Sequence, residues 1–482
     1  MLKLRPLNNI GILNHMWLKT IVVGACLLIA FLAVSGGLMP ALGFALLPLL
    51  FCFLLICIKY PYVSFLFLFT VCFFIMGVQR YTPLPIPSGL VVDMIILFNF
   101  LVITINHIYR NYHPHFKLPF FFLITVAWTV YCLVSVFNPA GTLENWLVTI
   151  RSIALHISLF QFLSYYIFKS VGRVNHFLLF WATLCLLAAL KAIGQKIIGF
   201  DTSEMIWLYT VGESTHVIYS GIRYFSFFTD AANFGCHMGL ATVVFSILAL
   251  NEKSRSLKTY YIIVAILTLY GMFISGTRSA MAIPFVGFAF YIISLRRWQF
   301  ILAGAVTFIT IFGFFAFTTI GNSNADIRRM RTAFQFSKDA SYNIRQENQA
   351  KMREFMGDYP IGLGIGAAKH TVDGDLLYDL PTDTSFVFIW VETGIIGLII
   401  YLFLWLSCLV ISLYYIWKRL KDPMIRALTS AASAGIAGMM AAGYGNEVLH
   451  QFPTGQTVYI LMAIVMLSPY LENRKNNEYT IR

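Results

Sequence analysis

Two arginines with small or polar neighbours are the clearest candidates for chemistry in this sequence. Arg223 lies in the segment GIRYFSFFTDAANFG, and Arg278 lies in SGTRSA. A guanidinium is permanently charged, and its planar set of donors matches the oxygens of a phosphate. A lone arginine beside an apolar run more often extends its charge to water. Two of them in such surroundings predict a site for a phosphate-bearing anion.

A second candidate segment follows farther along the chain. Gly362, Gly364 and Gly366 alternate there, which gives a flexible backbone whose N–H groups could approach an anion, although a structural turn explains the same pattern. His370 and Asp383 are candidate proton acceptors in the same segment, and each could equally be a solvated loop residue. No group of Asp, Glu or His has a spacing typical of metal ligands, so the sequence predicts no metal site.

The elements that must position these residues are membrane-spanning helices. Of the 482 residues, 59% are hydrophobic and 11% are charged, whereas a typical globular protein has roughly 25% charged residues. Apolar runs of about 18 residues or more are long enough to cross a bilayer as helices, and runs without two-residue alternation favour helices over a barrel. The predicted fold class is an all-α polytopic membrane protein, a single domain over residues 1–482 with twelve to fourteen transmembrane helices. Fourteen spans are expected at 20–34, 38–58, 61–78, 88–108, 118–137, 147–168, 175–196, 231–250, 259–275, 279–295, 299–319, 386–417, 427–446 and 456–471.

The distribution of basic residues predicts the orientation of these spans. The net charge of +13 is concentrated in short loops between apolar runs, and more than half of the 34 lysines and arginines fall in alternate loops. Because loops rich in lysine and arginine stay in the cytoplasm, both termini are expected there. The charge is thereby explained without nucleic acid. Two long segments, 197–230 and 320–385, are then extracytoplasmic, and the second, between spans eleven and twelve, is large enough to form a cap with helix-compatible spacing over 324–355 and turns over 357–366.

Ionisable residues inside the spans are costly in lipid and need partners. Arg151 could pair with Asp93 or with Glu144, and Glu392, deep in span twelve, is expected to hydrogen-bond another helix. Alanines and glycines in the span 427–446 predict close approach of neighbouring helices.

In these residues the sequence resembles the O-antigen ligase and polymerase superfamily, the group with a Wzy-type core. The resemblance covers roughly residues 220–400 and rests on the order of several loose motifs around one long loop. The Asp-Pro-Asn of that group lacks its proline here, and Asp383 stands where its ligases have a histidine. The matching positions are Arg223, Phe228, Asp230 and Asn233; Thr277, Arg278 and Ser279; Arg345; Pro360, Gly362, Gly364 and Gly366; and Ser385, Phe386, Glu392, Gly394 and Gly397.

The resemblance implies a GT-C-type helical fold and inverting, metal-independent glycosyl transfer without a cofactor, in the bacterial cytoplasmic (inner) membrane with an extracytoplasmic active site. The donor would be a glycan on undecaprenyl pyrophosphate, held by Arg223 and Arg278, with Arg345 assisting from the large loop. The acceptor would be a sugar hydroxyl, with Asp383 as the first choice of base and His370 as the second. Membrane lipid would be a further partner, and a chain-length regulator protein could be another.

The replacement of histidine by Asp383 favours a polysaccharide polymerase over a ligase that transfers the glycan to a lipid A core or a protein. A lipid-linked oligosaccharide flippase or secondary transporter is the alternative from another class. Transporters place substrate groups near the bilayer midplane, often within inverted repeats. The sequence shows neither two-fold hydropathy symmetry nor charges at mid-membrane, and its polar candidates gather on one predicted side.

Overall fold

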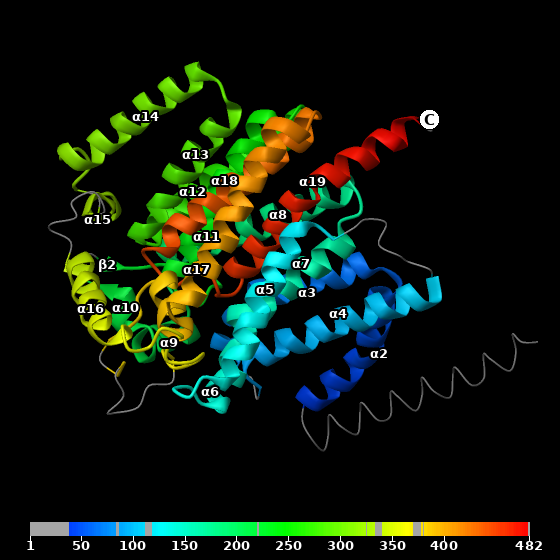
Figure 1. Cartoon of the computed structure of the whole chain (residues 1–482), viewed down its shortest axis with the longest axis horizontal. Helices are drawn as coiled ribbons and strands as arrows, with labels where there is room; N and C mark the ends of the chain where they lie inside the picture. The colour runs from blue at the N-terminus through cyan, green and yellow to red at the C-terminus, as the bar shows by residue number, and fades with distance from the viewer. Residues whose placement is uncertain are drawn as a thin grey trace, which may run out of the picture. The chain divides into compact units, whose positions relative to one another are not determined.

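The computed structural model describes residues 38–82, 86–110, 118–218, 221–323, 325–332, 340–369, 377–378 and 380–480. Most of the described residues are helical (Figure 1). Their only sheet is a short hairpin of two strands, β1 and β2, with two residues each. The first half contains α2 (Leu38–Lys59), α3 (Pro61–Tyr81), α4 (Ser88–Arg110), α5 (Phe120–Val134), η1 (Ser135–Phe137), α6 (Leu143–Ile150), η2 (Arg151–Leu155), α7 (His156–Ile167), α8 (Val171–Ile197), α9 (Thr202–Thr210), α10 (Glu213–His216), β1 (Val217–Ile218) and β2 (Gly221–Ile222). The second half contains α11 (Ala231–Asn251), α12 (Arg255–Ile274), η3 (Arg278–Met281), α13 (Ala282–Leu295), α14 (Trp298–Phe317), α15 (Ala325–Thr332), α16 (Ala340–Met356), α17 (Ser385–Tyr414), η5 (Tyr415–Arg419), α18 (Pro423–Gly443) and α19 (Thr454–Thr480).

The prediction of an all-α polytopic membrane protein is confirmed. Within the described part of the chain, eleven helices are long and apolar enough to cross a membrane, and two shorter apolar helices cover Ala45–Lys59 and Ile301–Phe317. Thirteen of the expected spans coincide with helices, and the expected span 20–34 lies outside the described residues. The exact number of spans and the GT-C assignment stay predictions.

The chain divides into two compact units, residues 1–64 with 101–112 and residues 65–100 with 113–482. In the first unit, the side-chain amide of Asn106 donates to the carbonyl of Ile58 at 2.6 Å. This bond pairs a polar group with backbone, as an apolar environment requires. All candidate site residues belong to the second unit. That both units form a single membrane domain stays a prediction.

Helices α11, α18 and α19 form the most buried part of the second unit. Small residues let them pack closely, as the sequence predicts. A side chain on Gly438 of α18 would come within 2.6 Å of the carbonyl oxygen of Ile283, and one on Gly287 within 2.9 Å of that of Ala434. The backbones of α13 and α18 are therefore in direct contact.

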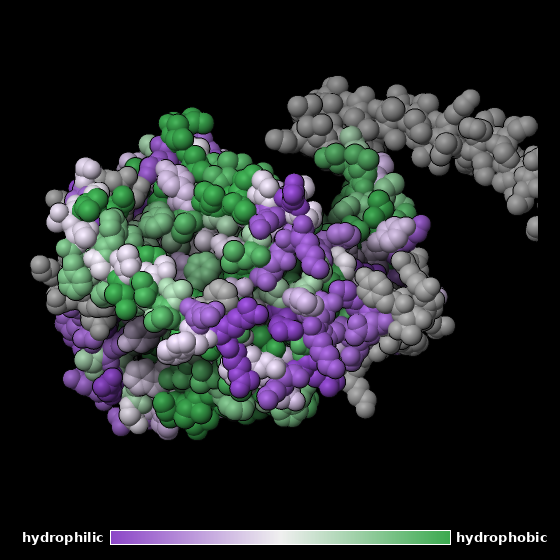
Figure 2. Space-filling view, turned by 90° about the horizontal axis from the view of Figure 1, so that it is seen from above, coloured by the Kyte–Doolittle hydropathy of each residue, from purple (hydrophilic) through white to green (hydrophobic). Residues whose placement is uncertain are grey.

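Large apolar side chains are exposed around the second unit, including Phe120, Ile266 and Val410, as expected of helices that face lipid. Figure 2 looks from above onto the part of the second unit that is uppermost in Figure 1, where hydrophilic residues gather beside hydrophobic ones. At the opposite end of the second unit lie α6, α9, α10 and α16 (Figure 1). Among the candidate residues, Arg345 lies on α16 and Arg278 begins η3, whereas the following lie in loops: Arg223, Gly362, Gly364, Gly366 and Asp383.

Local sequence explains where the two helices nearest the site begin. The side chain of Asp230 accepts from the amides of Ala232 at 2.7 Å and Asn233 at 2.8 Å, which starts α11. The hydroxyl of Thr384 accepts from the amide of Val387 at 3.1 Å and starts α17 in the same manner. Asp and Thr at these positions satisfy N–H groups that have no partner inside the helix.

Candidate functional site

Arg223 is held rigidly between the loop before α11 and the turn after α12. Its Nε donates to the carbonyl of Ser275 at 3.2 Å, Nη1 to the carbonyl of Thr215 at 2.9 Å, and Nη2 to the hydroxyl of Thr277 at 2.9 Å. A guanidinium has five N–H donors, so these bonds orient the group and leave donors for a ligand.

The two other predicted arginines both lie within electrostatic reach of Arg223. Burial lowers the pKa of Arg223 from its usual value, the charge of Asp230 opposes this, and the charges of Arg278 at the start of η3 and Arg345 on α16 lower it further. Arg329 of α15 also reaches this region, where its Nε donates to the carbonyl of Gly276 at 2.5 Å. Like charges in such proximity repel unless an anion compensates them, so the arrangement suits an anionic ligand.

Arg329 was not found by sequence reasoning. It lies among several arginines in a charged helical stretch, and no motif separates it from its neighbours. The prediction of helices in the long segment is confirmed at α15 and α16.

Helix α17 is interrupted at Gly394. The loop of residues 360–369, which contains the alternating glycines and is called the glycine-rich loop below, packs against the interruption. Gly394 has φ 69° and ψ −173°, outside the helical range. The amide of Ile395 donates to the carbonyl of Pro360 at 3.1 Å, and the amide of Leu363 donates to the carbonyl of Val391 at 2.8 Å. Loop and helix thereby satisfy each other's backbone groups, which is how a broken helix is tolerated in a membrane protein.

Glu392, next to this interruption, binds the glycine-rich loop. Its buried carboxyl accepts from the amide of Gly366 and, at 3.1 Å, from the amide of Ala368. The expectation that Glu392 bonds another helix is therefore wrong. The amide of Gly362 donates to the carbonyl of Tyr359 at 2.9 Å, so in this conformation the amides of Gly362 and Gly366 are used within the protein.

The alternating glycines are also required by packing. Gly362, Gly364 and Gly366 all have φ between 81° and 94°, which side chains rarely tolerate. A side chain on Gly364 would come within 2.6 Å of the Cα atom of Gly141. These contacts favour a structural role for the three glycines, and their role in binding an anion stays a prediction.

Asp383 is connected to the arginines through α16. Asn348 donates to a carboxylate oxygen of Asp383 at 3.2 Å, and it lies three residues after Arg345, on the same face of the helix. Asp383 has φ 45°, a strained conformation that a non-glycine residue adopts at a cost of about 1–2 kcal/mol. His370, the other expected base, lies outside the described residues.

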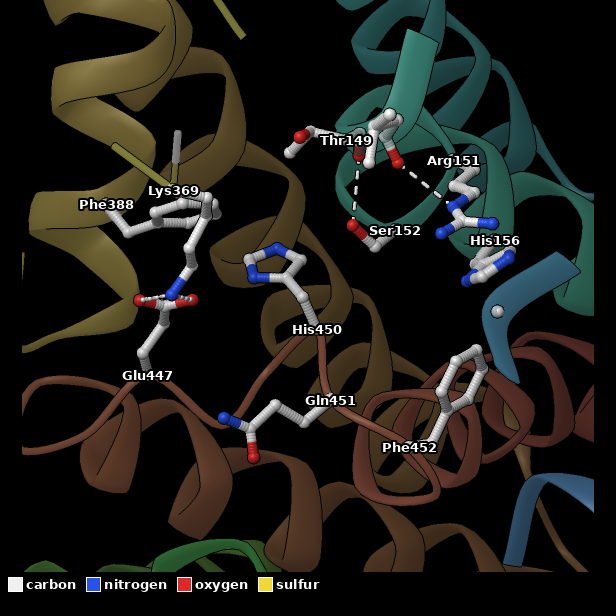
Figure 3. A pocket seen from close by; sticks show the side chains of 12 residues that line it. Thr149, Arg151, Ser152, His156, Lys369, Phe388, Glu447, His450, Gln451 and Phe452 are labelled. Carbon is white, nitrogen blue, oxygen red and sulfur yellow. Dashed lines mark hydrogen bonds and ion pairs between the residues drawn. The ribbon is translucent and has the colours of Figure 1, made fainter. Parts of the chain in front are cut away.

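The structure also forms a pocket of about 330 Å³ that sequence reasoning missed (Figure 3). Lys369 and Glu447 form an ion pair at 2.8 Å on one side of it. On the other side Arg151 pairs with Asp93 at 3.1 Å, which decides between the two partners that the sequence left open. Burial raises the pKa of Glu447, and Lys369 opposes this effect.

Two histidines line the same pocket. His156 is bonded through Nε2 to Asp93 at 2.8 Å, and His450 is bonded through Nε2 to the hydroxyl of Tyr401 at 3.1 Å. Burial lowers the pKa of His450 to about 3, so its ring is neutral at physiological pH. Within the described part of the chain, the Nδ1 atoms of both rings are buried without a hydrogen-bond partner.

The segment 444–453, between α18 and α19, connects this pocket to the arginines. The side chain of Asn446 donates to the hydroxyl of Ser279, the residue after Arg278. The side-chain Nδ2 of Asn233, at the start of α11, donates to the carbonyl of Phe452 at 2.6 Å. The sequence signal was weak, because Glu447 and its neighbours form a short polar stretch between two apolar spans.

The fold and the site together define a polytopic helical membrane protein with a cluster of arginines beside a polar pocket. Residues 263–402 match the O-antigen ligase family model. Over 216 residues, 42% of this chain, the sequence is 29% identical to an O-antigen polymerase of Salmonella muenchen, and the match spans half the length of that relative. The expected resemblance to the O-antigen ligase and polymerase superfamily is thereby confirmed.

Proposed function

We propose that this chain is a polysaccharide polymerase that transfers a growing glycan from undecaprenyl pyrophosphate to a lipid-linked repeat unit. The observation that carries the proposal is the electrostatic proximity of Arg278 and Arg345 to Arg223. It is supported by the match of residues 263–402, which include Arg278, to the O-antigen ligase family, and by the likeness to a polymerase.

The proposed chemistry is an inverting displacement at the anomeric carbon. The bond from that carbon to the pyrophosphate oxygen breaks, a sugar hydroxyl of the acceptor attacks from the opposite face, and its proton passes to Asp383 or His370. Negative charge develops on the leaving pyrophosphate, and the guanidiniums of Arg223, Arg278 and Arg345 stabilise it, which assigns to them the role a divalent metal would otherwise have. The glycine-rich loop would position Lys369 and Asp383 around the substrate.

The setting of this reaction follows from the charge distribution. Basic loops alternate along the sequence, which supports a protein of the bacterial inner membrane with both termini in the cytoplasm and the arginines on the extracytoplasmic side. The lipid tail of the donor would then lie against exposed apolar helices. A chain-length regulator protein as a partner stays a prediction.

The test is substitution of Arg223 and Arg278 by Ala, each followed by assay of polymer formation from lipid-linked repeat units in purified protein. Removal of a group that stabilises transition-state charge costs about 10²–10³-fold in rate, and we expect a loss of that size in each variant. Arg255→Ala is the matched control, because this exposed arginine begins α12, whose other end leads to Arg278.

Protein level and apparent melting temperature accompany each assay. Because Arg223 also bonds the surrounding backbone, Arg278→Ala decides the matter if Arg223→Ala lowers the protein level. Undiminished polymerisation by Arg278→Ala, at normal protein level, would remove that residue from the proposed phosphate site.

A ligase is the second candidate, favoured by the description of the matching family. Cells that lack a polymerase accumulate single-repeat products, whereas cells that lack a ligase accumulate long chains still on the lipid. For a flippase, labelled donor would cross liposome membranes without formation of a glycosidic bond. These three readouts separate the candidates.

A further inference from the structure

The pocket of Figure 3 differs in electrostatic character from the arginine cluster. Each cation that lines it has an anionic partner, Arg151 with Asp93 and Lys369 with Glu447. The pocket is therefore close to neutral overall. A free anion such as pyrophosphate gains little there, because the cations are already compensated. A neutral ligand rich in hydroxyl groups suits the pocket better.

The hydrogen-bonding groups of the pocket support the same ligand class. A carboxylate only accepts, so Nε2 of His156 donates to Asp93, and Nδ1 is the ring nitrogen left for a ligand. That atom is buried and unpartnered among the described residues, a state that costs about 1–3 kcal/mol unless a ligand compensates it. A sugar hydroxyl both donates and accepts, so it can pair with this nitrogen. Figure 3 shows the His156 ring beside Arg151, with His450 between them and the Lys369–Glu447 pair.

Apolar surface completes the pocket. The rings of Phe388 and Phe452 line it together with Gln451. A pocket of about 330 Å³ lies at the lower end of the usual range of roughly 300–1,000 Å³ for small-molecule sites, which suits one sugar ring. Aromatic rings can cover the C–H faces of a sugar while the polar groups bind its edge.

Its position suggests which sugar would occupy it. The hydroxyl of Thr382 donates to Glu447 at 3.4 Å, and the next residue is Asp383, one of the two proposed bases. The hydroxyl that loses its proton must lie near the base. We propose that this pocket binds an uncharged sugar of the acceptor repeat unit, with His156 and Glu447 as hydrogen-bond partners of its hydroxyl groups. This inference rests on the proposed transferase function.

The experiment uses two probes on the full-length purified protein. Binding of the methyl glycoside of the repeat unit to the pocket is measured by saturation-transfer NMR. Binding of undecaprenyl pyrophosphate to the arginine cluster (Arg223, Arg278 and Arg345) is measured by its competition with the donor. We expect His156→Gln and Glu447→Gln to weaken binding of the glycoside at least about tenfold, the effect of roughly 1.4 kcal/mol, while undecaprenyl pyrophosphate still binds. Arg278→Ala should show the reverse pattern. His176→Gln, an exposed histidine of α8, is the matched control and should leave both unchanged.

The two probes separate failure of the inference from failure of the proposed function. The inference is overturned if the glycoside binds equally well to both pocket variants and the wild type, or if it does not bind to the wild type at all. If polymerisation persists in that case, the proposed function still stands. A protein that binds no undecaprenyl pyrophosphate and forms no glycosidic bond overturns the proposed function, and the inference falls with it. Gln451→Leu provides a third pocket variant if either of the others fails to fold.

Discussion

Replacement of Gly394 by Ala should release the glycine-rich loop from α17. At φ 69° and ψ −173°, Gly394 occupies a backbone region that is essentially restricted to glycine. A methyl group there would overlap the carbonyl oxygen of Pro360 and would come within 2.5 Å of the amide nitrogen of Gly362. Neither atom is the flexible end of a side chain, so the backbone of helix or loop must move.

The expected cost has two parts. The unfavourable backbone conformation contributes about 1–3 kcal/mol. Separation of loop and helix removes the bonds from Ile395 to Pro360 and from Leu363 to Val391, each worth about 1 kcal/mol. The total is about 3–5 kcal/mol. With an unfolding entropy of roughly 2 cal/mol/K per residue over 482 residues, the apparent melting temperature should fall by about 3–5 °C.

The assay is thermal unfolding of purified protein in detergent, followed by a thiol-reactive dye, with polymer formation measured in parallel. Gly313→Ala is the control, because no atom beyond its own stretch of helix backbone lies within 4 Å of the added methyl group, and alanine is favoured in a helix by about 1 kcal/mol. It should leave the melting temperature unchanged or higher. Equal melting temperatures for the two variants would refute the reasoning about the interruption.

Two further predictions concern the segment before α11. Arg80 lies over the rings of Trp207 and Phe225 at 4.3 and 4.4 Å and donates to backbone carbonyls of this segment. Arg80→Ala should therefore destabilise the segment by about 2–3 kcal/mol. Limited proteolysis at residues 221–230 should become faster, and an unchanged cleavage rate would contradict this prediction. Burial, with nearby positive charge, lowers the pKa of His216 to about 4, and its Nε2 accepts from the amide of Ala231 at 3.0 Å. Between pH 6.5 and about 4 the unfolded chain binds a proton that the folded chain does not, so stability should fall by about 3 kcal/mol as pH falls through this range. His216→Asn should flatten the pH dependence of the melting temperature, and a slope equal to that of the wild type would count against the assignment.

The positions of the helices follow from the amino-acid sequence alone. Apolar runs near 20 residues must satisfy their own backbone in lipid, and only a helix does this within one segment. The expected span 231–250 therefore coincides almost residue for residue with α11, and 61–78 lies within α3. Alanine and glycine in α18 likewise predicted close packing, because their small size permits backbone contact wherever the partner lies.

The sequence also marked Arg223 and Arg278 as candidates for an anion site, because their small and polar neighbours distinguish them from arginines in basic loops. It could not show that Arg345 approaches them, since that depends on where α16 lies over the bundle. The resemblance to a known superfamily supplied a role for Arg345, and the tertiary structure supplied its proximity to Arg223.

The partners of the ionisable residues depend on how the helices and loops pack. Arg151 forms an ion pair with Asp93, whereas the sequence left both Asp93 and Glu144 open as partners. Glu392 accepts hydrogen bonds from loop amides, whereas the sequence predicted a bond to another helix. The pocket with His156 and His450 was likewise invisible in the sequence. Helix formation depends on residues within a few positions of one another, whereas these contacts join residues that are tens to hundreds of positions apart and form only through packing.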